Sequence, residues 1–138
     1  MTHTKSGFTL MELMIAIVIL GILGAVGIPA YLGYVKQANI STTKQNLKLL
    51  SGAITLFKAQ TGDYPQSLTD LIKRPSGEVG EDWAGPYLKG NRPPKDGFKK
   101  PFVYRPESEG EGRPYTLFSY GASGRRGKRS DRISVWGR

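Results

Sequence analysis

An unbroken apolar run near the start of the chain limits what this sequence can fold into more than any other feature. The run extends from Phe8 to Ile28 and contains one charged residue, Glu12, in its twenty-one positions. As a helix rising about 1.5 Å per residue it spans roughly 31 Å, the thickness of the hydrocarbon core of a bilayer. The run therefore predicts one transmembrane helix. The alternative is a secretory signal cleaved after Ala30, but the apolar region of such signals usually has only about 7–15 residues.

The glutamate inside the run needs an explanation. An acid at mid-membrane costs about 2.5–3.5 kcal/mol on insertion scales, and less near the membrane edge. In one interpretation the run is a plain anchor, and Glu12 lifts its carboxylate to the headgroups. In the other, Glu12 is a functional carboxylate that requires a cationic partner, and the run itself contains none.

The second half of the run contains residues that weaken a helix. These are Gly21, Gly24, Gly27 and Pro29. Each glycine costs a helix roughly 1 kcal/mol relative to alanine, and an interior proline costs about 3 kcal/mol. We therefore predict that residues 21–29 are the weakest part of the helix. The glycines equally suit close approach of neighbouring helices, and the sequence does not choose between these interpretations.

Beyond Pro29 the pattern becomes amphipathic. Apolar residues recur at spacings of three and four, which is the period of one helix face. They are Leu47, Leu50, Ile54 and Phe57, with Thr43 and Ile40 at the two preceding steps. Gly62 and Pro65 then predict an end near Gln60. We expect a helix over residues 30–60 with one buried face. Its four lysines, with no acid among them, indicate a solvated face or, alternatively, contact with anionic lipid.

Residues 61–138 have the composition of a small head. A short helix is predicted at Ser67–Lys73, followed by loop as far as Pro101. Three segments rich in β-branched and aromatic residues predict strands: Pro101–Arg105, Tyr115–Tyr120 and Ile133–Trp136. The expected fold class is α+β, with the long helix packed on a small antiparallel sheet. Four aromatic residues are expected in the core: Tyr87, Tyr104, Phe118 and Tyr120.

Composition restricts the chemistry available to the chain. Its 138 residues include no cysteine, so neither a disulfide framework nor a thiolate metal site can form. The one histidine is His3, which precedes the apolar run. If that segment is removed, catalysis by imidazole is excluded. The formal charge of +9 is uneven, because the last fourteen residues carry six cations and one acid.

The residues around Glu12 form a recognisable motif. Lys5, Gly7, Phe8, Thr9, Leu10, Glu12 and Leu13 read K-x-G-F-T-L-x-E-L. This motif closely resembles the leader and N-terminal helix of the type IV pilin-like superfamily. The resemblance implies a leader at residues 1–7, cut by a prepilin peptidase between Gly7 and Phe8, followed by methylation of Phe8. It implies a transmembrane and assembly helix at residues 8–29, in which Glu12 attracts the N-terminal amine of a neighbouring subunit. In that superfamily the glycine-rich segment can lose helicity on assembly.

The head extends the resemblance to most of the chain. The stretches TGDYP, GPYLKG, PPKDGF, KPFVYRPESEGEG and LFSYGASG follow the order and spacing found in major pseudopilins of type II secretion. The resemblance implies a non-enzymatic subunit of a homopolymeric filament, anchored by one pass in the bacterial inner membrane with its head in the periplasm. Its implied partners are other copies, minor pseudopilins, the inner-membrane assembly platform and its ATPase. The alternatives are a surface type IV pilus subunit and a monomeric anchored module that binds anions or DNA.

The chain departs from this resemblance after YGASG, where the subfamily has an acidic loop that holds calcium. Calcium takes about 6–8 oxygen ligands, commonly several carboxylates. Here Ser123 stands where an aspartate is expected, and Asp131 is the nearest acid. Four cations within five residues would repel the ion: Arg125, Arg126, Lys128 and Arg129. We therefore expect no calcium and no other cofactor.

Two explanations for the basic loop stay open. It can pair with an acidic turn, within the head or across subunits; that turn contains Glu107, Glu109 and Glu111. Alternatively the loop is simply solvated, and each ion pair contributes under about 1 kcal/mol. Nucleic acid is a disfavoured partner, because no aromatic residue lies between Arg125 and Arg132 to stack on bases.

Overall fold

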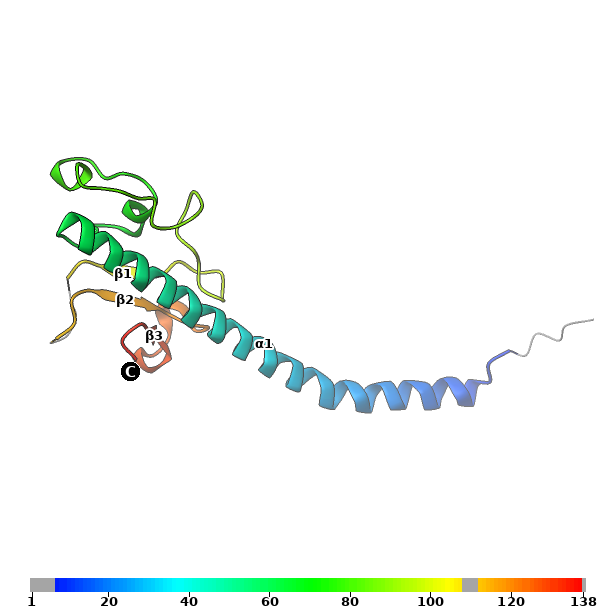
Figure 1. Ribbon diagram of the computed structural model, residues 1–138. Helices are drawn as coiled ribbons and strands as arrows, with labels where there is room; N and C mark the ends of the chain where they lie inside the picture. Colours follow the sequence, from blue (N-terminus) through cyan, green and yellow to red (C-terminus); the bar gives the residue numbers. More distant parts are fainter. Residues whose placement is uncertain (1–6, 108–111, 138) are drawn as a thin grey trace, which may run out of the picture. The chain divides into compact units, whose positions relative to one another are not determined.

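The computed structural model describes residues 7–107 and 112–137. One long helix, α1 (Leu10–Thr61), is followed by a region of short 3-10 helices, loops and three strands (Figure 1). The chain divides into two compact units, Met1–Lys36 and Gln37–Arg138. The first contains the apolar part of α1, and the second contains the rest of α1 with the head.

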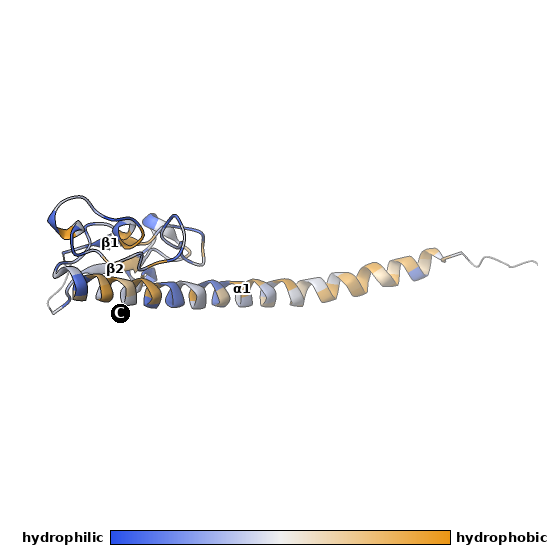
Figure 2. Ribbon diagram, turned by 45° about the horizontal axis from the view of Figure 1, so that its top comes forward, coloured by the Kyte–Doolittle hydropathy of each residue, from blue (hydrophilic) through white to orange (hydrophobic). Residues whose placement is uncertain are grey.

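The first unit is a helix without a core. The large apolar side chains from Leu10 to Leu32 are each at least half exposed, and apolar colour dominates this part of α1 in Figure 2. By length and composition alone, α1 can cross a membrane. The helix passes through Pro29 without a break, so the residues predicted to weaken it do not interrupt it in the single chain.

The end of α1 matches the prediction. The helix stops at Thr61, and Gly62 follows with φ of +84°. The Gly62 N–H donates to the carbonyl of Lys58 at 3.0 Å. Glycine adopts this left-handed conformation without the steric cost of a Cβ, which makes it the usual residue just after a helix.

Three short strands form one antiparallel sheet in the order β1 (Val103–Arg105), β2 (Thr116–Ser119), β3 (Ile133–Ser134). Tyr104 pairs with Leu117, and Ser119 pairs with Ile133. All three predicted strands are present, but each is shorter than predicted. The predicted helix at Ser67–Lys73 is a 3-10 helix, Leu68–Leu71, whose cap is Ser67 donating its backbone N–H to Asp70 at 2.8 Å.

The core of the second unit lies between α1 and the sheet. The predicted stripe of α1 is buried, with Phe57 and Ile54 fully inaccessible, and Thr43 is buried one step before it. Residues from the loops and strands complete this core: Leu71, Leu88, Phe102, Tyr115 and Leu117. The amphipathic helix and its buried face are therefore confirmed.

The aromatic prediction was wrong for one of its four residues, Tyr120, because Phe118 is buried. Tyr87 and Tyr104 pack against the core, as expected. Phe118 is buried but lies outside the core cluster, and Tyr120 is only half-buried. The reason is the alternation of side chains along a strand. Since Leu117 faces α1, Phe118 must face the opposite side of the sheet.

Candidate assembly surfaces

Glu12 is held at the start of α1 by reciprocal hydrogen bonds with Thr9. The Thr9 backbone N–H donates to Glu12 Oε2 at 2.9 Å, and the Thr9 hydroxyl donates to the same oxygen at 3.1 Å. The Glu12 backbone N–H lies 3.2 Å from Thr9 Oγ1. This is a capping box, in which the acid at the third helical position satisfies the residue before the helix. The carboxylate is thus aimed at the helix N-terminus while remaining exposed.

The sequence interpretation missed the role of Thr9. It sought a partner for Glu12 in another subunit and overlooked one in the same chain. The signal was present, because T-x-x-E directly before an apolar run is the pattern of a capping box. Glu12 therefore has one role within the chain, the cap, and one that is still a prediction, the contact between subunits.

The predicted cleavage site lies just outside the helix. Gly7 and Phe8 are exposed and non-helical, and the Phe8 side chain is 91% exposed. The described part of the chain does not cover the bond between them, and cleavage there stays a prediction. The remainder of the predicted leader, residues 1–6, lies outside the described residues.

The glycines of the apolar helix have no neighbour within the described chain. A Cβ built on Gly21, Gly24 or Gly27 meets no atom within 4 Å. No packing among residues 7–107 and 112–137 requires glycine at these positions. Both interpretations of the glycines, helix weakening and close approach of a neighbouring helix, stay predictions.

A buried polar network lies beneath the C-terminal loop of the head. Asp96 is 5% exposed and accepts three hydrogen bonds. Its donors are the Ser119 hydroxyl at 2.5 Å, the Phe98 N–H at 2.9 Å and the Lys100 N–H at 2.7 Å. Ser119 Oγ also accepts the N–H of Gly121 at 2.9 Å. Because a buried carboxylate is costly without such partners, this network ties the turn around Asp96 to the end of β2.

The side chain of Lys100 extends this network to the loop itself. Its ammonium donates to the carbonyl of Gly121 at 3.1 Å and to that of Ala122 at 2.9 Å. Lys100 is half-buried. A cation from the protein thus binds the carbonyls that begin the loop. No local sequence pattern indicates this contact, which joins residues more than twenty positions apart.

The same loop is closed by its own turns. Gly121 has φ of +65°, and a Cβ there would lie only 2.6 Å from the carbonyl oxygen of Asp131. Asp131 Oδ2 accepts the backbone N–H of Lys128 at 3.3 Å. Ser123 is exposed. The chain therefore returns onto itself between Gly121 and Asp131 through contacts with its own backbone.

Several oxygen atoms of this loop already accept hydrogen bonds from the protein. Two backbone carbonyls at the start of the loop already accept from an ammonium, and the carboxylate of Asp131 already accepts from the backbone. In the ranges 7–107 and 112–137, no group of three or more Asp, Glu, His or Cys residues is placed to hold a metal ion. Calcium prefers several carboxylates around one point, and the expected absence of calcium stays a prediction.

The basic loop is exposed and lacks the predicted acidic partner in the described part of the chain. Its four cations lie on two 3-10 helices, Gly124–Arg126 and Arg129–Asp131, and on the residues between and beside them. No ion pair joins them to Glu107 among the described residues. Glu109 and Glu111 lie outside the described residues. Pairing across subunits therefore stays a prediction.

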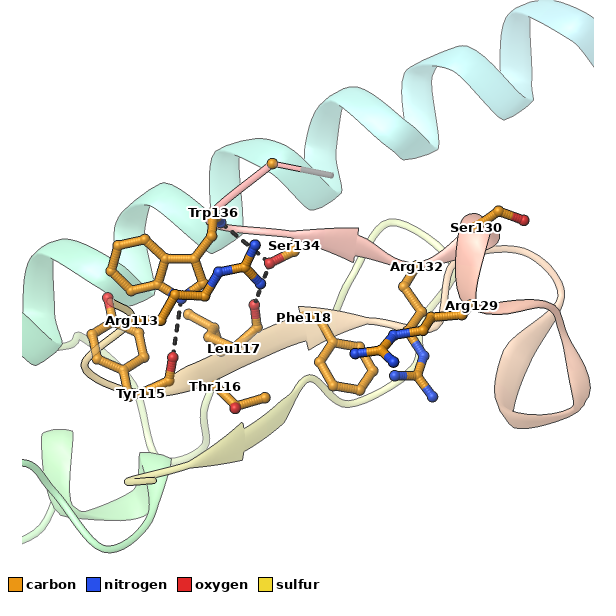
Figure 3. Close-up of a pocket in the computed structure, with 11 residues that line it drawn as sticks. Arg113, Tyr115, Thr116, Leu117, Phe118, Arg129, Ser130, Arg132, Ser134 and Trp136 are labelled. Atoms are coloured by element: carbon orange, nitrogen blue, oxygen red, sulfur yellow. Dashed lines mark hydrogen bonds between the residues drawn. The ribbon is translucent and has the colours of Figure 1, made fainter. Parts of the chain in front are cut away.

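An open pocket lies next to the basic loop, on the side of β2 that carries Phe118 (Figure 3). Its volume is about 390 Å³. The Arg132 guanidinium lies 4.6 Å from the centre of the Phe118 ring, an attractive cation–π contact. At the other end, Trp136 Nε1 donates to the Tyr115 carbonyl at 3.0 Å. The pocket therefore combines aromatic faces with arginine side chains.

The exposed apolar helix is not a stable end state for a chain in water, because its surface requires a membrane or a partner. Together with the small α+β head and the carboxylate at the start of the helix, it fits a subunit of the pilin-like class. Residues 2–28 match the model of the prokaryotic N-terminal methylation motif. Residues 30–136 match the model described as type II secretion system protein G. The chain belongs to that protein G family, whose members are structural pseudopilins.

Individual relatives agree with this assignment. The type II secretion system core protein G of Pseudomonas aeruginosa is 36% identical over 129 residues, which cover 89% of this chain and 87% of the relative. That of Aeromonas hydrophila is 33% identical over 137 residues, covering 96% and 92%. A fimbrial protein of Neisseria meningitidis is 36% identical over 89 residues, covering 64% of this chain and 50% of the relative. The pilin likeness is thus partial, whereas the pseudopilin likeness spans nearly the whole chain.

Proposed function

We propose that this pseudopilin is cut between Gly7 and Phe8, methylated at Phe8, and polymerised through Glu12 into a periplasmic filament for type II secretion. The observation that carries the proposal is the capped carboxylate at the start of an uncovered apolar helix. Glu12 lies four residues after the new N-terminus at Phe8. The capping box keeps its carboxylate directed to that end of the helix.

On assembly, the Glu12 carboxylate would exchange its partner in the same chain for a more strongly attracting amine of a neighbouring copy. In the single chain, Glu12 is satisfied by the hydroxyl and N–H of Thr9. In a bundle of apolar helices, a carboxylate and an amine about 4 Å apart attract each other far more strongly than in water, and an unpaired charge is penalised. An amine from a neighbouring copy would therefore fix the axial register between subunits.

The family of the chain supports an inference about its membrane topology and its partners. We infer one pass through the inner membrane with the head in the periplasm. The filament would act with a prepilin peptidase, minor pseudopilins, an assembly platform and an ATPase, and the chain itself would catalyse nothing. The exposed apolar surface of residues 10–32 supports membrane insertion before assembly and helix packing after it.

We further propose that the head needs no calcium. The support is the Lys100 ammonium, which already bridges the carbonyls of Gly121 and Ala122. The Lys100 ammonium, which is part of the chain, would then hold the start of the loop in place of a bound ion. Unlike a bound ion, it cannot dissociate when external calcium is low.

The experiment that tests the main proposal combines mass spectrometry with three variants. Intact-mass analysis of the membrane-extracted protein should give a chain that begins at Phe8 and carries one extra methyl group. Glu12→Gln keeps an oxygen acceptor for the cap but removes the charge, and Thr9→Ala removes the hydroxyl and keeps the charge. We expect Glu12→Gln and Glu12→Ala to insert and be cleaved but to lose filaments, whereas Thr9→Ala still assembles. Normal filaments from Glu12→Gln would contradict a role for the charge.

A further inference from the structure

The head carries opposite charges on two separate surfaces. One is the basic face, formed by the pocket beside β2 and the basic loop. It contains Arg113, Arg125, Arg126, Lys128, Arg129 and Arg132. The other is the acidic loop, residues 78–82, which contains Glu78, Glu81 and Asp82. In Figure 1 the acidic loop (green) and the C-terminal segment (orange to red) lie on opposite sides of α1.

The acidic loop is exposed and anchored. The side chains of Glu78, Glu81 and Asp82 are all exposed, and none forms an ion pair within the described residues. The Arg74 guanidinium donates to the carbonyl of Gly80 at 2.5 Å, and Trp83 Nε1 donates to the carbonyl of Asp70 at 2.9 Å. The loop therefore presents three carboxylates on a fixed backbone, which lowers the entropy lost on binding.

The basic face is also preformed. Arg132 lies over Phe118 at 4.6 Å and near Tyr120 at 5.5 Å, so its guanidinium is held against the sheet. Arg113 and Arg129 line the same pocket (Figure 3). Arginine suits such a site because its planar fork binds a carboxylate with two parallel hydrogen bonds. A pocket lined by three arginines and three aromatic residues fits an acidic peptide segment.

Within the described residues of one chain, no ion pair joins the acidic loop to the basic face. An open filament, however, is built by repeating one contact between two different patches of the same subunit. We propose that the acidic loop of one copy docks on the basic face of the next copy in the filament. This inference rests on the proposed function, and it assigns the basic loop to contact between heads rather than to a metal or to nucleic acid.

Charge reversal in the full-length chain tests the contact. Arg129→Glu changes an exposed residue of the pocket, and Glu81→Arg changes the acidic loop. We expect each single reversal to lower the yield of filaments by about tenfold or more, since a close charge pair at an interface couples by at least that factor. The double variant Arg129→Glu with Glu81→Arg should restore most of the yield. Lys89→Glu, an exposed cation outside the basic face, is the matched control and should leave the yield unchanged.

Crosslinking gives a second readout, because the chain has no cysteine of its own. Ser130→Cys lines the pocket, and Ala84→Cys is exposed beside the acidic loop. A short bismaleimide should link copies into a ladder only when both cysteines are present. The ladder should disappear in the background of either single charge reversal.

The outcomes separate the inference from the function on which it rests. If the unaltered chain forms filaments and each charge reversal leaves the filament yield as unchanged as Lys89→Glu does, the inference is overturned and the proposed function stands. Loss with Arg129→Glu but not with Glu81→Arg would also overturn it, because the acidic partner would then be something other than this loop. Absence of any filament from the unaltered chain would refute the proposed function and this contact together.

Discussion

Replacing Lys100 with methionine removes one ammonium and keeps most of the apolar stem. In the folded head that ammonium donates to the carbonyls of Gly121 and Ala122. A hydrogen bond from a charged donor contributes about 1.5–3 kcal/mol when well buried. Lys100 is half-buried and the Ala122 contact is exposed, so we reduce each bond to about 1 kcal/mol for solvent screening. We therefore expect Lys100→Met to cost about 2 kcal/mol in unfolding free energy, by the same reasoning.

This loss is measurable as a change in melting temperature. For a folded unit of about 100 residues, 1 kcal/mol corresponds to roughly 4–8 °C, so the expected decrease is on the order of 10 °C. The assay is thermal unfolding of the detergent-solubilised full-length protein, followed by tryptophan fluorescence. Trp136 is a suitable reporter because its ring lies 5.1 Å from that of Tyr115 in the C-terminal part of the head.

The neighbouring residue supplies the control. Lys99 is exposed, and its ammonium makes no hydrogen bond within the described residues, so Lys99→Met removes the same charge without the contact. Calcium and EDTA should leave the melting temperature of the unaltered chain unchanged. Equal melting temperatures for Lys100→Met and Lys99→Met would refute the reasoning. A melting temperature of the unaltered chain that falls by several degrees in EDTA would also refute it.

Two further predictions concern the head. Gly97→Ala places a Cβ against the backbone of Asn39, so we expect about 1–3 kcal/mol of destabilisation in urea titrations; the exposed Gly52→Ala, which meets no atom within 4 Å, should instead stabilise by about 1 kcal/mol. Equal effects of the two changes would contradict the close contact. Burial raises the pKa of Tyr104, so above pH about 10 the unfolded chain releases this proton first and stability falls as pH rises. Tyr104→Phe removes the hydrogen bond to the Pro65 carbonyl, so its free energy of unfolding at pH 8 should be about 1 kcal/mol lower. Between pH 8 and pH 11, however, the free energy of unfolding should decrease less for Tyr104→Phe than for the unaltered chain.

The long helix was predictable because its signals are local and redundant. The stripe from Leu47 to Phe57 repeats with the helical period, and Gly62 ends the helix where its positive φ is needed. The strands were predicted in the right places but too long. Tyr120 is not part of β2 because the chain turns at Gly121, whose φ is +65°. Trp136 is not part of β3 because its backbone N–H donates to Ser134 Oγ at 3.2 Å rather than to a neighbouring strand.

The contacts around the C-terminal loop were not predictable from the sequence. Lys99 and Lys100 are identical residues in adjacent positions, and no local pattern says which one faces the loop. Lys99 adopts φ of +64°, and this turn geometry directs Lys100 toward Gly121. Such information lies in the three-dimensional path of the chain. By contrast, the capping box of Thr9 and Glu12 was readable, since both residues lie within one turn of helix.

The Lys100 contact and the basic face are physically linked. Lys100 fixes the chain at Gly121 and Ala122, and the loop that follows ends with Arg129 and Arg132 at the pocket. A loop released at its start would hold those arginines less firmly, so a neighbouring head would lose more conformational entropy on docking. Lys100→Met should therefore reduce both melting temperature and filament yield, whereas Arg129→Glu should reduce filament yield alone. If Lys100→Met lowered the melting temperature and left filament yield unchanged, the loop would be only a stabilising element, and the basic face would act independently of it.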